Sequence, residues 1–222
     1  MTIGDKQDAL ADRLTDFTPD EHTSPRLTAL FAAAVTLAEP APSHTAISLC
    51  RRFDIPRHHL YEIVLQSYLF LGFPRMLEAA DVLHSVWPAE QQPSELPPVS
   101  ADEADEWFTR GEQLCRRVYT ETYEPLRRRV VRMAPEVFRW MIFEGYGKVL
   151  SREGLDMIDR ELAIISFLMV ENRPRQLHSH IKGAVNIGAD PAVVSRVLEE
   201  LRPVSPDGYS SARIICDRLE IR

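Results

Sequence analysis

The sequence predicts an all-α fold. Nearly every segment of the 222 residues repeats its apolar side chains with the period of a helix, and none shows a convincing two-residue alternation. Prolines and glycines fall between the periodic segments, where helices begin and end. The composition, 45% hydrophobic and 27% charged, is that of an ordinary globular protein, and the chain is long enough for a substantial core.

Local signals bound the expected helices. Pro56 and Pro74 each open a helix, because proline is tolerated in the first turn, where its missing N–H has no intrahelical role. Gly72 and Gly188 each end one, since glycine readily adopts the left-handed conformation that closes a helix. Ser100–Glu103 is a capping-box sequence. The expected helices cover residues 4–16, 26–38, 43–53, 56–71, 74–86, 101–119, 123–133, 136–146, two apolar helices between 158 and 187, 191–201 and 207–219.

The chain also carries a faint internal repeat. At an offset near 135, Arg26–Val35 overlays Glu161–Val170, and the shared pattern is a long apolar helix, a turn, a short helix and a helix opened by proline. The stretch around 91–100 is rich in proline and cannot be regular helix. We therefore expect two halves, residues 1–90 and 101–222, joined by a linker over 91–100.

Composition excludes several classes of function. The net charge of −7 argues against a mainly electrostatic nucleic-acid binder, which needs a basic face. Cys50, Cys115 and Cys216 are odd in number and form no C-x-x-C, which indicates buried thiols in a reducing compartment and no zinc site. The longest apolar runs are too short to span a bilayer, and the polar N-terminus is unlike an export signal. We expect a cytoplasmic protein with no membrane partner.

The stretch RELAIISFLMVENRPRQLHSH holds the most informative side chains. Glu161 lies in the apolar stripe of one helix, and on the next helix Gln176, Leu177 and His180 share the inward face. The two helices would hold a carboxylate and an imidazole together out of water. His178 and His180 are two residues apart and point to different sides of a helix, so they cannot chelate one ion, and no metal is expected.

Three stretches resemble the carboxymuconolactone decarboxylase family, whose wider superfamily includes the AhpD-like alkylhydroperoxidases. They are EIVLQSYLFLGFP (Glu62–Pro74), YGKVLSREGLDMIDREL (Tyr146–Leu162) and QLHSHIKGAVNIGADP (Gln176–Pro191). The resemblance implies an AhpD-like helical fold with two fused carboxymuconolactone-decarboxylase-like repeats. It also implies a small-molecule substrate and a homo-oligomer, either a trimer or a dimer of double repeats.

The AhpD-like branch of that family uses Glu, eleven residues, Cys, two residues, Cys, three residues, His. Counted from Glu161, this spacing reaches Arg173, Gln176 and His180, so the acid and the base match and both cysteines do not. Thiol peroxidase chemistry needs a thiolate and a resolving thiol. The sequence therefore argues against that mechanism.

The decarboxylase branch needs a group that protonates carbon after carbon dioxide leaves, and groups that hold an anionic substrate. His180 is the candidate proton donor, because imidazole titrates near neutrality, and Glu161 would orient it. Arg160 or Arg173 would bind an anionic group of the substrate, and no cofactor is expected. The expected substrate-binding residues are Glu62, Gln66, Tyr68, Arg160, Arg173 and Gln176.

Other readings of the same residues stay open. One alternative is that His180 is a core histidine hydrogen-bonded to a carbonyl or to Glu161, and another is that the chain is an oligomeric binding protein that has lost catalysis. Thr45–Leu65 also scans like a helix-turn-helix, but its second helix continues as LQSYLFLG, too apolar for a DNA groove. We therefore expect no nucleic-acid partner.

Overall fold

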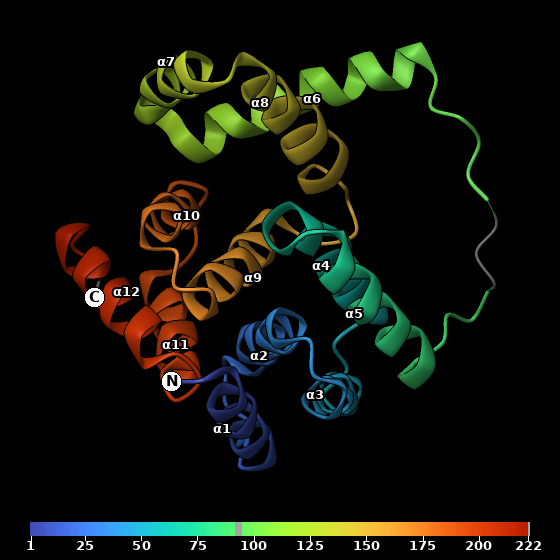
Figure 1. Ribbon diagram of the computed structural model, residues 1–222, viewed down its shortest axis with the longest axis vertical. Coiled ribbons are helices and arrows are strands. Elements are labelled where there is room, and N and C mark those ends of the chain that lie inside the picture. Colours follow the sequence, from blue (N-terminus) through green and yellow to red (C-terminus); the bar gives the residue numbers. More distant parts are fainter. Residues whose placement is uncertain (92–94, 222) are drawn as a thin grey trace. The chain divides into compact units, whose positions relative to one another are not determined.

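The computed structural model describes residues 1–91 and 95–221, and every regular element within them is helical (Figure 1). This confirms the predicted all-α class. The elements are α1 (Ile3–Thr15), α2 (Thr23–Leu37), α3 (Pro40–Arg52), α4 (Arg57–Leu71), α5 (Phe73–Val86), α6 (Ala101–Tyr119), η1 (Thr120–Thr122), α7 (Tyr123–Met133), α8 (Pro135–Trp140), η2 (Met141–Leu150), α9 (Met157–Val170), α10 (Pro174–Asn186), α11 (Pro191–Leu201) and α12 (Pro206–Arg218).

The helices form two compact units. The larger unit combines residues 1–88 with 154–222, and the smaller unit comprises residues 89–153. This division differs from the predicted halves, because α9 to α12 pack with α1 to α5 in one unit. The reason is the composition of α9, which is apolar on all sides and needs helices around its whole circumference.

Two central helices make the core of the larger unit. α2 and α9 lie side by side (Figure 1), and both are buried along most of their length. α3 and α11 pack on α2, whereas α10 and α4 pack on α9. The nearly continuous apolar sequence of α2 and α9 follows from this position, since neither helix has a face left for water.

Most predicted helix ends agree with the structure to within three residues. Gly72 and Gly188 have φ angles of 83° and 104°, the left-handed region that the predicted helix ends require. The hydroxyl of Ser100 accepts a hydrogen bond from the Glu103 amide at 3.1 Å and caps α6. In the described parts of the stretch 87–99 there is no helix, as its prolines predict.

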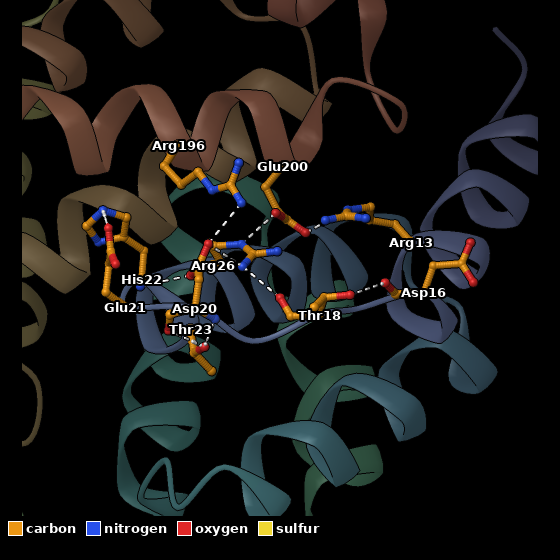
Figure 2. A network of polar contacts seen from close by, with 10 residues as sticks. All are labelled: Arg13, Asp16, Thr18, Asp20, Glu21, His22, Thr23, Arg26, Arg196 and Glu200. Carbon is orange, nitrogen blue, oxygen red and sulfur yellow. Dashed lines mark hydrogen bonds and ion pairs between the residues drawn. The ribbon is translucent and has the colours of Figure 1, made fainter.

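A network of charged side chains joins α1, α2 and α11 inside the larger unit. Arg26 on α2 donates through Nε to Glu200 Oε2 at 2.8 Å, and Arg13 donates to the other oxygen of Glu200 at 2.7 Å. Arg26 also pairs with Asp20 at 2.8 Å, and Arg196 reaches the same Asp20 oxygen at 2.9 Å. Figure 2 shows Arg26 between these carboxylates. Arg26 and Glu200 are almost fully buried, so each is the main compensation for the charge of the other.

Asp20 is held as a carboxylate by this network. Burial alone would raise the pKa of Asp20, but hydrogen bonds from Arg26, the His22 amide and Arg196 lower it to about 2. Because the unfolded carboxyl titrates near 3.8, the group stabilises the fold above about pH 4 and loses that contribution as the pH falls toward 2.

The smaller unit is built on a close crossing of α6 and η2. A Cβ added at Gly111 would lie 2.1 Å from the carbonyl oxygen of Ile142, and one at Gly147 would lie 2.0 Å from that of Trp107. The two backbones therefore touch without side chains between them. The sequence predicts an α-helix over 136–146 here, and this is wrong in part, because α8 ends at Trp140 and η2 continues to Leu150 as a π-helix.

Cys50, Cys115 and Cys216 are all free and buried, as expected for structural thiols. Among residues 1–91 and 95–221, no helix has both the length and the apolar character needed to cross a bilayer.

Candidate acid/base site

The structure brings Glu161 and His180 together inside the larger unit. Glu161 lies on the second turn of α9, and His180 lies in the middle of α10. A turn centred on Asn172, which has a φ of 51°, reverses the chain between the two helices. Nδ1 of His180 lies 2.7 Å from Oε2 of Glu161, and both residues are buried. The predicted contact is therefore present.

The contact determines which nitrogen of His180 is available. A carboxylate only accepts hydrogen bonds, so Nδ1–H of His180 donates to Glu161 and fixes the orientation of the ring. Among the described residues, nothing else hydrogen-bonds to this imidazole. Nε2 is thus the atom that can give a proton to a bound molecule or take one from it.

Glu161 also holds an oxygen with no partner. Oε1 is buried and accepts no hydrogen bond from the part of the chain that the structure describes. An unsatisfied buried carboxylate oxygen costs roughly 1–3 kcal/mol or more, so such groups are rare and call for an explanation. A donor on a bound molecule, or a water, would satisfy it.

Phe70 covers the imidazole and was not among the residues predicted for the site. Its ring meets that of His180 edge to face, with 5.5 Å between centroids, and lies 6.0 Å from the ring of Phe167. Glu62, Gln66 and Phe70 follow one another at four-residue spacing on α4, so the stripe that predicted the first two also contains the third. The aromatic ring keeps water away from one side of the acid/base pair.

Arg160, Glu62 and Gln66 form a second polar cluster next to the pair. Nη2 of Arg160 lies 2.9 Å from Glu62 Oε2, Nη1 donates to Gln66 Oε1 at 3.3 Å, and Nε donates to the Leu155 carbonyl at 3.1 Å. Gln66 donates back to the carbonyl of Arg160 at 3.1 Å. The guanidinium is fully buried and bonded to protein on three nitrogens. These residues tie α4 to α9, so the expectation that Arg160 binds an anionic substrate is not supported by its surroundings.

The remaining predicted residues lie away from this cluster or at its edge. Arg173 is exposed and pairs with Glu171 at 3.3 Å. Gln176 is exposed, which corrects its predicted inward position, because its neighbour Leu177 takes the buried position on this turn of α10. Tyr68 is half-buried and stacks on Phe73 with 4.7 Å between ring centroids. The structure therefore forms two groups from the predicted residues, Glu161 with His180, and Arg160 with Glu62 and Gln66.

The thiols are poorly suited to peroxidase chemistry. Burial raises the pKa of Cys50 to about 12 and also raises the pKa of Cys216. A thiolate is the reactive form of cysteine, and these surroundings disfavour it. Within residues 1–91 and 95–221, no three of the His, Cys, Asp and Glu side chains come close enough to hold a metal ion.

Two carboxyl groups meet at the start of α9, next to Arg160. Asp156 caps the helix by accepting a hydrogen bond from the Asp159 amide at 3.0 Å. Burial, and then the charge and side chain of Asp156, raise the pKa of Asp159 to about 6. At neutral pH the ionised form of Asp159 is therefore destabilised by its surroundings.

Replacing Asp159 by asparagine is expected to stabilise the protein at neutral pH. In the unfolded chain this carboxyl titrates near 3.8, so between about pH 4 and pH 6 the folded state holds the proton more tightly. The free energy of unfolding therefore falls as the pH rises through this window, and the full penalty is present above pH 6. We expect Asp159→Asn to add about 1 kcal/mol at pH 7, discounted for partial exposure, and nothing below pH 4. Urea unfolding at the two pH values measures this.

Asp5 provides a matched control. It occupies the same third position of α1, but hydrogen bonds from the backbone and side chain of Thr2 lower its pKa. Asp5→Asn should therefore have the opposite sign and slightly destabilise the protein at pH 7. A shift of the same sign in both variants would contradict the role assigned to Asp156.

Comparison with known proteins assigns no function to this site. A scan against models of protein families finds no match to the chain, and a search of curated proteins finds no significant match.

Proposed function

We propose that this protein is carboxymuconolactone decarboxylase-like and performs cofactor-free acid/base chemistry, of the decarboxylation type, on a small carboxylated or lactone-like molecule. The single observation that supports this most is the buried contact between Glu161 and His180, which leaves Nε2 of the imidazole without a partner among the described residues. His180 is the proton donor in this proposal, and Glu161 is the residue that positions it.

The chemistry follows from the arrangement. When the carbon–carbon bond to the carboxylate breaks, carbon dioxide leaves and the electron pair moves into the lactone carbonyl as an enolate. Protonated His180 then gives the proton on Nε2 to the carbon, and the enolate collapses to the product. Glu161 balances the positive charge of the imidazolium through its bond to Nδ1. Phe70 excludes water from one side, which strengthens these electrostatic interactions.

Features of the larger unit support an internal duplication. Arg160 lies 134 positions after Arg26, each is the fourth residue of its helix, and Pro174 lies 134 positions after Pro40, each opening the next helix. Both arginines are buried and pair with a glutamate, Arg26 with Glu200 on α11 and Arg160 with Glu62 on α4. Each bridge therefore joins the central helix of one repeat to the third helix of the other.

The same offset of 134 positions indicates that each chain holds one acid/base pair. The positions 134 residues before Glu161 and His180 are Leu27 and Ala46, both buried and apolar. Only the second repeat keeps the chemistry, and the first serves as its support. In this proposal the residues tying the two repeats together, Glu62 and Gln66, position α9 and do not touch the substrate.

Changing either residue of the pair should lower turnover. With carboxymuconolactone itself as the first substrate tried, we expect His180→Ala to lower kcat by about 100- to 10,000-fold, since a positioned general acid contributes that much. Glu161→Gln should lower kcat less and shift the pH profile, because the ring loses its charged partner. Release of carbon dioxide and absorbance of the lactone product are the measurements.

His178→Ala is the control, since His178 lies on the same helix two residues away and makes none of these contacts. Turnover that survives in His180→Ala would refute the catalytic role of the residue. No turnover by the parent protein on any carboxylated lactone would favour the alternative of an oligomeric binding protein.

We further propose that the protein is a cytoplasmic homo-oligomer, a trimer or a dimer of double repeats. The resemblance of the three sequence stretches to the decarboxylase family supports this. Light scattering of the purified chain gives the number of copies, and a monomer at micromolar concentration would contradict the proposal.

A further inference from the structure

A groove in the larger unit lies apart from the acid/base pair. It runs between the end of α2, the start of α3 and the outer side of α5, and has a volume of about 310 Å³. Pockets of this size accommodate small organic molecules. The lining residues that matter to its chemistry are Ala34, Val35, Glu39, Glu78, Ala79 and Asp81.

The groove has an apolar floor and negatively charged carboxylates along its walls. Ala34, Val35 and Ala79 are buried and form the floor, whereas Glu78 and Asp81 are exposed. None of the lining residues is a lysine, arginine or histidine. A molecule that fills the groove therefore meets hydrocarbon on one side and negative charge on the other.

The carboxylates are not neutralised by the protein. Within the described residues, Glu78 and Asp81 have no hydrogen-bond or ion-pair partner. The side chain of Glu39 accepts only a weak hydrogen bond from Gln7 Nε2, at 3.4 Å. On α6, by contrast, Glu106 and Glu112 each pair with an arginine four residues later.

The two carboxylates on α5 repel each other, and a bound cation would remove this repulsion. Glu78 and Asp81 are three residues apart, so their side chains are neighbours on the same face of the helix. Like charges on one face of a helix repel each other and destabilise it. A positively charged group placed between them is attracted to both and reverses the sign of this contribution.

We propose that the groove binds a small organic cation, an ammonium group carried on a short hydrocarbon chain. The ammonium lies at Glu78 and Asp81, with Glu39 on the opposite wall, and the hydrocarbon covers the floor formed by Ala34 and Val35. This site takes a ligand of opposite charge to the carboxylated molecule proposed for His180, so the two sites do not compete.

The experiment uses n-hexylammonium as the probe and backbone amide NMR of the full chain as the readout. Saturable shifts are expected at Val35, Ala38 and Val82, with a Kd on the order of 1 mM, which is typical of one ion contact and a short apolar chain. Hexanol and hexanoate at the same concentrations test the need for positive charge. Raising the salt concentration should weaken the binding of the ammonium.

Glu78→Gln and Asp81→Asn should each weaken binding about tenfold. Asp207→Asn, an equal change in net charge on α12, should leave it unchanged, because α12 does not line the groove. His180→Ala should bind the probe like the parent, so failure of the proposed catalysis leaves this test intact. Equal shifts with hexanol, no saturation, or full binding by the Glu78 and Asp81 variants would overturn the proposal.

Discussion

Glu200→Ala is expected to destabilise the larger unit by about 3–5 kcal/mol. Glu200 is buried and accepts hydrogen bonds from Arg26 at 2.8 Å and from Arg13 at 2.7 Å. Among the described residues, removing it leaves buried Arg26 with Asp20, the Thr18 carbonyl and the face of the Phe17 ring as partners. Breaking a buried pair from one side costs this much because an uncompensated charge remains. Hydrogen exchange of the α2 amides and urea unfolding measure the loss.

Two further variants separate this charge effect from simple truncation. Glu199→Ala changes the neighbouring residue, which is exposed, pairs with Arg202 at 3.8 Å and accepts a hydrogen bond from the Tyr209 hydroxyl, and should cost about 1 kcal/mol at most. Arg26→Met combined with Glu200→Leu removes both charges and should recover much of the stability, because apolar side chains of similar volume replace a buried pair well. Equal losses in Glu199→Ala and Glu200→Ala would show that the buried network is not what stabilises the unit.

Gly147→Ala is expected to disrupt the smaller unit. The added methyl group would lie 2.0 Å from the carbonyl oxygen of Trp107 and 3.1 Å from that of Ile142, and backbone atoms cannot rotate away as a flexible side chain can. α6 and η2 must separate, at a cost of about 3 kcal/mol or more, the upper end for overpacking in a core. Faster hydrogen exchange of the α6 and η2 amides measures the effect.

Gly145→Ala is the matched control for this variant. Gly145 lies in the same π-helix, and a Cβ added there meets no atom within 4 Å. The change should be neutral or slightly stabilising, because alanine loses less backbone entropy than glycine. Similar destabilisation by both alanines would mean that η2 is sensitive to any substitution and that the crossing with α6 is not the cause.

The helices were predictable because each is marked by local chemistry. Pro56, Pro74 and Pro191 stand at or next to helix starts, and Gly72 and Gly188 stand at helix ends, so short-range signals and the apolar period sufficed to place these helices. The π-helix of Met141–Leu150 was not predictable, because nothing in its sequence distinguishes an i→i+5 ladder from an ordinary helical turn. Its close contact with α6 was equally hidden.

The acid/base site was predictable only in part. Glu161 and His180 lie in apolar stripes of consecutive helices, and consecutive helices joined by a short turn pack together, so their 2.7 Å contact follows from local pattern. Arg160 stands beside Glu161 in the chain, but its partners Glu62 and Gln66 come from α4, nearly a hundred residues earlier. Their role as a buried tie and not as substrate ligands depends on which groups surround the guanidinium.

The sequence by itself determined the helical class, most of the helix boundaries, the buried thiols and the Glu161–His180 pair, because these depend on residues close together in the chain. Tertiary structure decided the rest. The division into units, the pairing of Arg26 with Glu200, the crossing at Gly147 and the groove between α2, α3 and α5 all depend on contacts between distant segments. The spacing of apolar residues indicates which face of a helix is buried. Only the packing of the folded chain decides which other helix covers that face.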